Sequence, residues 1–450
     1  MEPALIILLM FSTMMLLMLT GQRVFAILGF VGSVCALLLW GGGSGADMSF
    51  NAAIKLFNWY PMLSLPMFIF MGYMISEAGI ANDMYHALHV WMGGLRGGLA
   101  IGTVVMMIFI SAMNGLSVAG MAIGCSVALP ELVKRNYDKR MISGVIQSAS
   151  SLGILIPPSV VLVLYGIIAR ENIEKLWLAG IVPGLFMAVV FIAYIVIRCR
   201  INPKFGPALP KEERNYAAKE KLRVLGAGVI PLVLMAVVIG SFFSGFASLA
   251  ESSAIGAVAA FLVAVAKKRV TKAVIKNTLK QTLNASAMFM WVMMAALAFA
   301  AVFDGLGAVH AIEGLFTDLG ISKWGILILM QVSFIIMGIF LDDTAMLVIV
   351  APLYIPLLIK LGFDAVWFGV LYTITCQVAY LTPPFGYNLF LMRAMSPPDF
   401  TIRDIYASII PFVVLMFICL VLIMVFPDIA LWLPDKVTAL REAAKAAGGL

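Results

Sequence analysis

The chain has 450 residues, of which 63% are hydrophobic and only 12% are charged, and its mean hydropathy is +1.05. No soluble core of this length needs so many apolar runs of about 20 residues, so the composition excludes a soluble domain and indicates a polytopic membrane protein. The net charge of +7 does not indicate nucleic-acid binding, because the basic residues cluster in short loops between the apolar runs.

Several chemical signatures are missing from the sequence. No P-loop, HExxH pair or serine–histidine–acid constellation occurs, so neither ATP hydrolysis nor peptidase chemistry is predicted. The five cysteines are scattered in or beside apolar runs and form neither a disulfide framework nor a CxxC metal pair. Residues 4–20 are predicted to remain as a first helix rather than to be removed, because Glu2 replaces the basic region of a signal peptide.

The first half of the chain is predicted to contain spans, interfacial helices and one hairpin. In order, these are spans at 4–20 and 24–40, an interfacial helix at 47–59, a span at 61–79, an amphipathic segment at 81–96, an interrupted run at 97–134, a broken span at 141–169 and a span at 176–198. The run from Gly97 to Lys134 is too long for one span and is interrupted at Asn114-Gly115. This favours a helix–turn–helix hairpin that enters and leaves the membrane by the same face.

The second half is predicted to repeat this pattern after two central spans. A basic linker at 198–223 and a basic loop at 267–280 enclose spans at 224–243 and 247–266, and the positive-inside bias places both basic segments in the cytoplasm. The remaining elements are a span at 284–303, an interfacial helix at 306–319, a hairpin at 323–361 with Asp342-Asp343-Thr344 at its tip, a broken span at 364–396, a span at 404–427 and a short surface helix after Pro427.

Proline pairs interrupt an apolar span at equivalent places in the two halves, Pro157-Pro158 and Pro383-Pro384. LPELVK (129–134) matches IPLLIK (355–360), and each lies the same distance before its proline pair. Counting crossings from the basic segments, the first hairpin opens to the cytoplasm and the second to the outside. The halves are therefore predicted to be inverted repeats, as in secondary transporters whose binding sites lie at the membrane midplane.

Each proline pair is predicted to leave main-chain oxygens without a helical donor. A proline strands the carbonyl four residues back, so the affected groups are those of Gly153 and Ile154 in the first half and Ala379 and Tyr380 in the second. In hydrocarbon a bare carbonyl costs several kcal/mol, roughly, unless an ion, water or protein group satisfies it. A hard cation such as Na⁺ takes backbone oxygens as ligands without added charge, so two cation sites are predicted.

The predicted ligand sets combine each break with the facing hairpin tip. The first sodium site comprises Asn114, Gly115, Ser117, Gly153, Ile156 and Pro158, and the second comprises Gly338, Asp342, Thr344, Ala379, Thr382 and Phe385. The helices after the breaks begin at Ser159 and at Gly386-Tyr387-Asn388, and their positive dipole ends favour an anionic substrate between the sites. The predicted substrate-binding residues are Asn114, Ser117, Ser159, Asp343, Tyr387 and Asn388.

Structural alternatives exist for several of these residues. Asp342 or Asp343 is also a candidate for capping the helix that follows, although acids at membrane depth are by default functional candidates. Asn114 and Ser117 are also candidates for satisfying the hairpin turn, and Gly338 for close helix packing.

Two further polar features receive a structural interpretation. Arg393 is predicted to extend to the cytoplasmic face rather than to contact substrate. Asp83, His86 and His89 have the spacing of a metal site on one helical face, but a solvated interfacial face is preferred. His310 has no obvious partner in the sequence.

The chain resembles, over nearly its whole length, the large membrane subunit of TRAP (tripartite ATP-independent periplasmic) transporters. Four segments carry the most specific resemblance. They are SLGILIPPS (151–159), LPELVKRNYDKR (129–140), GIFLDDTA (338–345) and YLTPPFGYNLF (380–390). The resemblance implies an elevator transporter of the ion transporter superfamily, with a scaffold, a moving domain and a sodium ion at each hairpin tip. Transferred by motif, the sodium ligands are the tip Asn114–Ser117 with Gly153, Ile156 and Pro158, and Gly338 with Ala379, Thr382 and Phe385.

This resemblance divides the chain into five parts. They are scaffold helices at 1–96, the first half of the transport domain at 97–175, central scaffold helices with basic linkers at 176–303, the second half of the transport domain at 304–403, and a C-terminal scaffold helix and tail at 404–450. The fold expected is thus an all-α polytopic membrane protein with inverted repeats, two re-entrant hairpins and two broken transmembrane helices.

The function expected is sodium-coupled uptake of a small organic anion across the bacterial inner membrane, with Na⁺ as coupling ion and no other cofactor. The resemblance implies two partners, a small membrane subunit of four helices and a periplasmic substrate-binding protein, and the N-terminus is placed in the periplasm. Two alternatives stay open. One is a stand-alone anion symporter or exchanger that needs no binding protein, and the other is an intramembrane enzyme that uses Asp342 and Asp343.

The sequence also departs from the family pattern at both candidate sites. The first hairpin tip reads MNGLS (113–117) in place of a cluster rich in glycine and serine, and Ala379-Tyr380 stands where the second break usually has glycine. The YLTPPFGYNLF segment resembles the branch associated with keto acids, hydroxy acids and aromatic acids more than it resembles the sialic-acid branch.

Overall fold

Apolar helices form nearly all of the structure. The computed structural model describes residues 3–210, 216–307, 314, 320–383 and 386–446, and no strand occurs among these residues. Within this part of the chain, six helices are long and apolar enough to cross a membrane, or up to eight if each strongly bent pair counts as one span. The prediction of an all-α membrane protein with several apolar helices is confirmed.

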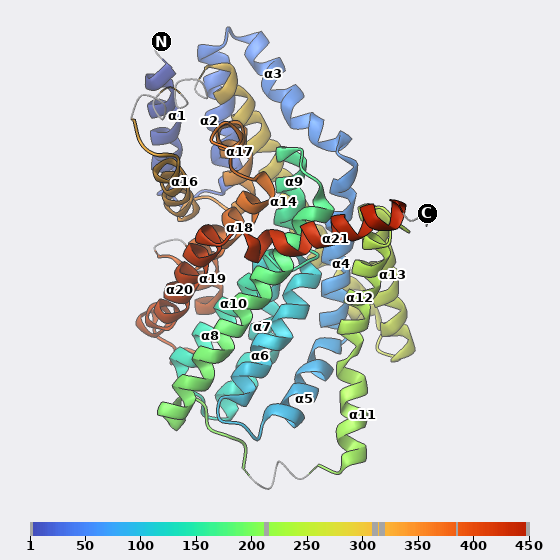
Figure 1. The fold of residues 1–450 in the computed structure, drawn as a ribbon. Helices are drawn as coiled ribbons and strands as arrows, with labels where there is room; N and C mark the ends of the chain where they lie inside the picture. Colours follow the sequence, from blue (N-terminus) through green and yellow to red (C-terminus); the bar gives the residue numbers. More distant parts are fainter. Residues whose placement is uncertain (1–2, 211–215, 308–313, 315–319, 384–385, 447–450) are drawn as a thin grey trace.

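One set of helices, which we call the frame, comes from the N-terminal segment and the middle of the chain. It contains α1 (Pro3–Met18), α2 (Val24–Leu39), α3 (Gly43–Ile54), α4 (Ser64–Glu77), α5 (Ile80–Met92), α11 (Ala218–Gly228), α12 (Ile230–Phe243), α13 (Leu249–Ala266) and α14 (Lys272–Gly305). The short 3₁₀ turns η1 (Lys55–Asn58) and η2 (Tyr60–Leu63) join α3 to α4. Helix α14 packs against α2, α3 and α4, so the frame is one continuous body (Figure 1).

The second basic segment is partly helical, which corrects the prediction of a loop at 267–280. Helix α14 begins at Lys272 and continues for 34 residues, and Thr271 caps it by accepting a hydrogen bond from the Val274 amide at 3.2 Å. No glycine or proline interrupts residues 272–303, and lysine and alanine are good helix formers. The predicted span at 284–303 is therefore the second part of a longer helix. The interfacial helix predicted at 306–319, with His310, lies mostly outside the described residues.

The other large set, the central group, consists of two hairpins and two interrupted helices. In the first half these are α6 (Gly98–Asn114) with α7 (Ser117–Lys134), and α8 (Lys139–Ser151) with the 3₁₀ turn η3 (Leu152–Ile154) and α9 (Val160–Ala169). In the second half they are α16 (Lys323–Gly338) with α17 (Asp343–Lys360), and α18 (Ala365–Leu381) with α19 (Tyr387–Met395). Each proline pair falls between the two parts of an interrupted helix, as predicted.

Helix boundaries recur at one constant offset between the halves. Helices α7 and α17 begin at Ser117 and Asp343, and α8 and α18 begin at Lys139 and Ala365. Both pairs are separated by the same number of residues as the two proline pairs. The halves also exchange contacts, because α7 packs against α19 and α9 packs against α17. In Figure 1, the α6–α7 hairpin occupies the lower part of the molecule and α17 the upper part.

Two long helices and a C-terminal helix surround the central group. Helices α10 (Ile173–Ile201) and α20 (Ile402–Val425) follow the interrupted helices and contain Pro183 and Pro411. The tail forms α21 (Asp428–Ala446), which lies across α10 (Figure 1). Arg441 of α21 pairs with Glu174 at 2.6 Å and donates to the Phe243 carbonyl at 2.6 Å. The predicted surface helix is therefore longer than expected and attached to the α10 and α12 ends.

Asp83 is paired rather than solvated, which corrects the interpretation of the 81–96 segment. Its carboxylate accepts from Lys267 and from both terminal nitrogens of Arg269, the latter at 2.9 Å each. Arg269 also donates to the carbonyls of Ala78 and Gly79 at 3.2 and 3.0 Å. The cluster ties the α4–α5 corner to the α13–α14 connection. No group of three potential metal ligands occurs among the described residues.

Replacing Asp83 with asparagine is expected to destabilise the frame. The change leaves Arg269 and Lys267 without their carboxylate in a half-buried place, which should cost about 1–2 kcal/mol. The midpoint of thermal unfolding of the purified protein should fall by a few degrees, whereas Asp47→Asn, at an exposed position on α3, should leave it unchanged. Equal midpoints for the two variants would show that the cluster contributes nothing.

Candidate functional site

The tip of the first hairpin lies directly against the first helix interruption. Gly115, between α6 and α7, has a φ of 64°, the left-handed region that favours glycine. A Cβ atom on Gly115 would lie 2.6 Å from Cγ2 of Val160 and 3.0 Å from the carbonyl oxygen of Pro158. Both the backbone conformation and the space therefore require glycine, and the structure brings the predicted residues Gly115 and Pro158 together.

The end of α8 is held against the end of α6. A Cβ on Gly153 would lie 2.4 Å from the carbonyl carbon of Ser111, and the Ser111 hydroxyl donates to the Ser150 carbonyl at 2.7 Å. The predicted ligand Ile156 places its side chain elsewhere, against Gly184 of α10, where a Cβ would lie 2.4 Å from its Cγ1. Only the main-chain oxygen of Ile156 is thus a candidate ligand.

The two stranded carbonyls of the first break differ in their partners. The Ile154 carbonyl accepts from the Ser159 hydroxyl, so the prediction that it is bare is wrong. The same hydroxyl accepts from the Leu162 amide at 3.2 Å and caps α9, which commits Ser159 to its own backbone rather than to substrate. Among the described residues, no hydrogen bond reaches the Gly153 carbonyl.

At the second break, the carbonyl predicted to be bare also has a donor. The Ala379 carbonyl accepts from the Thr382 amide at 3.1 Å, because the chain tightens into a final turn before Pro383. The carbonyls of Tyr380 and Thr382 instead approach Gly386, where a Cβ would lie 2.7 and 3.1 Å from them. Phe385 lies outside the described residues.

The second hairpin tip packs closely on α18. A Cβ on Gly338 would lie 2.5 Å from the Cβ of Ala379, so a larger residue would separate the tip from the break. The contact agrees with the packing role considered for Gly338. It brings together Gly338 and Ala379, two of the six residues predicted for the second sodium site. Thr382 uses its hydroxyl to donate to the Val378 carbonyl at 2.7 Å, which leaves its carbonyl as the candidate ligand.

Two adjacent acids occupy the start of α17. Asp342 stands at the N-cap position but makes no capping hydrogen bond, so capping alone does not explain it. Asp343 accepts from the amide and the hydroxyl of Thr344 at 2.8 and 3.3 Å through Oδ1. Oδ1 of Asp342 and Oδ2 of Asp343 are buried without a hydrogen-bond partner in the described part of the chain. Buried carboxylate oxygens of this kind are costly unless a cation or donor joins them.

Asn388 connects the two halves at the centre of the molecule. Its amide nitrogen donates to the Ser117 hydroxyl at 3.1 Å, to the Gln147 carbonyl at 3.2 Å and to the Ser150 hydroxyl at 3.2 Å. Asn388 and Ser117 are almost completely buried. The structure thus joins these two predicted substrate residues, and Asn388 links α19 to both α7 and α8.

Asn114 and Tyr387, the other predicted substrate residues, occupy different surroundings. The Asn114 amide donates to the Ile110 carbonyl at 2.9 Å, and its side chain lies against Gly72 of α4, where a Cβ would be 1.9 Å from Oδ1. Asn114 therefore faces the frame rather than the first break. The Tyr387 ring meets that of Tyr380 edge-on, with centroids 6.3 Å apart.

Buried glutamines near both breaks were missed by the sequence analysis. Gln147 on α8 and Gln377 on α18 are fully buried. Oε1 of Gln147 and both polar side-chain atoms of Gln377 lack a partner among the described residues. An amide in the middle of an apolar span was the signal that could have identified them, because polar groups at that depth are expensive.

The end of the second interrupted helix is anchored by basic residues. Arg393 donates to the Phe400 carbonyl at 2.5 Å, so it fixes the turn after α19. Lys139, at the start of α8, pairs with Asp399 at 2.8 Å. The hydrogen bond from Lys139 holds the pKa of the Asp399 carboxyl below its usual range. These contacts connect the start of the first interrupted helix to the turn that follows the second.

Two hairpin tips that meet two interrupted helices inside an apolar, all-helical chain define a polytopic membrane protein of the transporter class. The family model for the tripartite ATP-independent periplasmic transporter, DctM component, matches residues 11–429, and the chain belongs to this family. It is therefore the large membrane subunit of a TRAP transporter, as the sequence resemblance predicted. Membership implies a role in solute uptake, with a periplasmic binding protein and a small membrane subunit as partners.

Similar proteins cover nearly all of the chain. It is 30% identical over 415 residues to the C4-dicarboxylate TRAP transporter large permease protein DctM of Pseudomonas aeruginosa, covering 91% of this chain and 93% of that protein. It is 26% identical over 426 residues to the ectoine/5-hydroxyectoine TRAP transporter large permease protein UehC of Ruegeria pomeroyi, covering 94% and 98%. The solved YdaH transporter of Alcanivorax borkumensis matches with a TM-score of 0.59 over 89% of this chain and 90% of that chain, at 13% identity, and shares the fold.

Replacing Gly115 with alanine is expected to separate the first hairpin tip from the break. A left-handed alanine costs about 1–2 kcal/mol, and its Cβ would overlap Val160. Uptake by the reconstituted transporter should fall by about tenfold or more, and the unfolding temperature should drop. Gly226→Ala is the matched control, because Gly226 lies in a helix with open space around its Cβ position. Uptake that stays normal in Gly115→Ala would contradict the role of the tip.

Proposed function

We propose that this subunit carries a small organic anion, such as a carboxylate, keto acid or hydroxy acid, inward across the bacterial inner membrane together with Na⁺. A periplasmic binding protein delivers the solute, a small four-helix subunit completes the membrane part, and the N-terminus lies in the periplasm. The observation that carries the proposal is the meeting of each hairpin tip with a helix interruption where buried oxygens lack donors, namely the carbonyl of Gly153 and the carboxylates of Asp342 and Asp343.

Cation binding is supported by the chemistry of these oxygens. Main-chain carbonyls and carboxylates are hard ligands that suit Na⁺, and each lies where lipid would leave it unsatisfied. Near the first break, the candidate ligands are the carbonyls of Gly153, Ile156 and Pro158 beside Gly115. Near the second, the Thr382 and Tyr380 carbonyls lie close to Gly386, and Asp342 supplies a carboxylate.

Anion binding is supported by the helices that begin after the breaks. Helix α9 begins at Val160 and α19 at Tyr387, and the first turns of both helices point positive dipole ends toward the centre. Ser117 and Asn388 add a hydroxyl and an amide within the same region. The two relatives are named for C4-dicarboxylates and for ectoines, and each of these small solutes carries a carboxylate group that a positive helix end could bind.

Elevator movement is supported by how the central group is connected. The exchange of contacts between α7 and α19, and between α9 and α17, ties both hairpins and both interrupted helices into one unit. Such a unit is suited to move as a body past the frame while the sites stay intact. The opposite placement of the hairpins in Figure 1 supports inverted repeats.

Uptake into proteoliposomes tests the proposal directly. The large and small membrane subunits are reconstituted together, and entry of radiolabelled succinate is followed with the binding protein added outside. Uptake is expected to need both an inward sodium gradient and the binding protein. Full uptake without a sodium gradient would overturn the sodium coupling, and full uptake without the binding protein would favour the stand-alone symporter.

Replacing Pro157 with alanine tests the carbonyl argument. An amide at residue 157 would donate to the Gly153 carbonyl and compete with the ion, so the half-saturating Na⁺ concentration should rise about tenfold. Pro130→Ala removes a proline from an exposed position near the C-terminal end of α7, opposite the hairpin tip, and should leave the sodium dependence unchanged. The measurement is the initial rate of uptake against Na⁺ concentration. Identical curves for wild type and Pro157→Ala would exclude this carbonyl as a ligand.

A further inference from the structure

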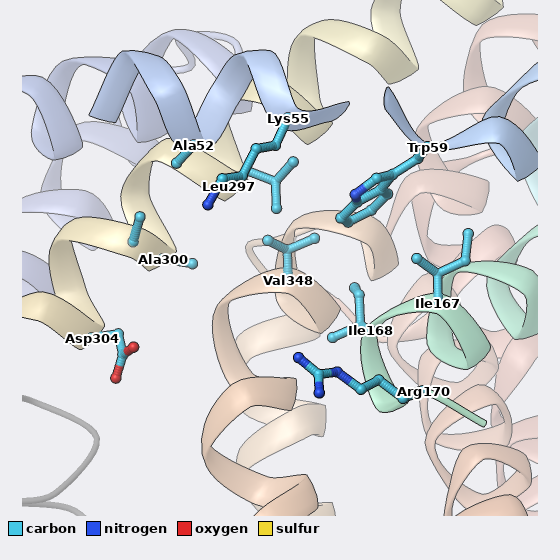
Figure 2. Close-up of a pocket in the computed structure, with 11 residues that line it drawn as sticks. Ala52, Lys55, Trp59, Ile167, Ile168, Arg170, Leu297, Ala300, Asp304 and Val348 are labelled. Carbon is cyan, nitrogen blue, oxygen red and sulfur yellow. The ribbon is translucent and has the colours of Figure 1, made fainter. Parts of the chain in front are cut away.

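A cavity lies between the frame and the central group. Its volume is about 440 Å³, which suits a small organic molecule. Lys55, Trp59 and Asp304 line it from η1, the turn that follows and α14 of the frame. Arg170 and Val348 line it from the end of α9 and from α17 of the central group (Figure 2).

The charged side chains of the cavity approach it from different directions. Figure 2 shows Lys55 entering from above, Arg170 entering from below, and Asp304 at a third side. None of the three forms an ion pair with another residue in the described part of the chain. Two cations and one acid leave the cavity with one net positive charge, and the ring of Trp59 adds an apolar wall.

Arg170 stands in a backbone conformation that usually selects another residue. It ends α9 with a φ of 57°, and this left-handed position after a helix is normally occupied by glycine, which adopts it without strain. Arginine has no conformational advantage here. The backbone conformation therefore does not select arginine, and the side chain of Arg170 lines the cavity.

We propose that this cavity is a second binding site for organic acids, in which a carboxylate group is held between Arg170 and Lys55. A guanidinium group can bind a carboxylate through two parallel hydrogen bonds, and the ammonium group adds a point charge. The choice of an organic acid rests on the proposed transport function, and the cavity would hold the solute at the boundary across which the central group moves. Asp304 repels the acid and keeps its affinity low enough for release.

Removing a positive charge and removing the negative charge should therefore change the affinity for the acid in opposite directions. Removal of either cation weakens binding of the acid, whereas removal of the Asp304 charge strengthens it. A role of these residues in folding alone would not produce this reversal. Arg170→Gly is especially informative, because glycine suits the left-handed backbone and the variant keeps the fold while it loses the guanidinium group.

Thiol labelling measures the field in the cavity without any transport step. The variant Ala300→Cys places a thiol in the cavity wall, and it is prepared as the complex of large and small subunits, reconstituted in phosphatidylcholine. The probes are anionic 2-sulfonatoethyl and cationic 2-(trimethylammonium)ethyl methanethiosulfonate. Each rate is divided by the rate of the same reagent with free 2-mercaptoethanol, and the normalised rate of the anionic reagent is expected to be about threefold or more above that of the cationic one. Millimolar succinate should slow both reagents, while neutral succinamide should not, and the parent protein, which keeps Ala300, gives the background.

The variants decide the outcome. Arg170→Gly and Lys55→Gln should each lower the ratio of anionic to cationic rates by about threefold or more and weaken protection by succinate, whereas Asp304→Asn should raise both. Equal normalised rates for the two reagents, or equal protection by succinamide, would overturn the proposal. Protection that requires anionic lipid in the vesicles would also overturn it, because a lipid headgroup would then be the ligand. Loss of sodium-coupled uptake in the separate assay would overturn the transport function and leave this site standing.

Discussion

The need to satisfy main-chain oxygens in an apolar interior governs this structure. The proline pairs remove backbone amide donors from two helices. The carbonyls that lose these donors find different hydrogen-bond partners. The Ser159 hydroxyl donates a hydrogen bond to the Ile154 carbonyl, and the Thr382 amide donates one to the Ala379 carbonyl. Nearby groups therefore satisfy two of the carbonyls that the prolines leave without a helical donor. The Gly153 carbonyl receives no hydrogen bond from the described residues. The hairpin tips pack against the interruptions. This close contact is possible because Gly115 and Gly338 have no side chain.

The halves are alike in backbone but different in chemistry. Ser117 and Asp343 hold the same position, the first residue of the second hairpin helix, in their respective halves. The first is neutral and bonded to Asn388, whereas the second is a buried acid with an unpaired oxygen. The two candidate sites therefore differ in charge. Buried carboxylates stand at the start of α17, whereas neutral donors and acceptors stand at the start of α7.

Local rules explain which features could be predicted from the sequence. Proline and glycine act on their own neighbourhood, so the two breaks and the turn at Gly115 could be located without a structure. The partners of particular oxygens could not, because Thr382 reaches Ala379 only after the chain tightens there. Gln147 and Gln377 could have been noticed as amides inside apolar runs, but their position beside the breaks depends on tertiary packing that the sequence does not show. Residues 272–280 contain several lysines, which suggested a loop, yet they form the first turns of the uninterrupted helix α14.

Charge at the start of α17 also connects the two proposed binding events. Two carboxylates in the central region repel the proposed anion as long as their unpaired oxygens face no cation. In the proposed mechanism, a cation at Asp342 would remove this repulsion and favour anion binding. By thermodynamic linkage, the anion would then strengthen binding of the cation by the same factor. Coupled movement of the two solutes would follow from this reciprocity, because the half-loaded central group would bind each solute too weakly to carry it alone.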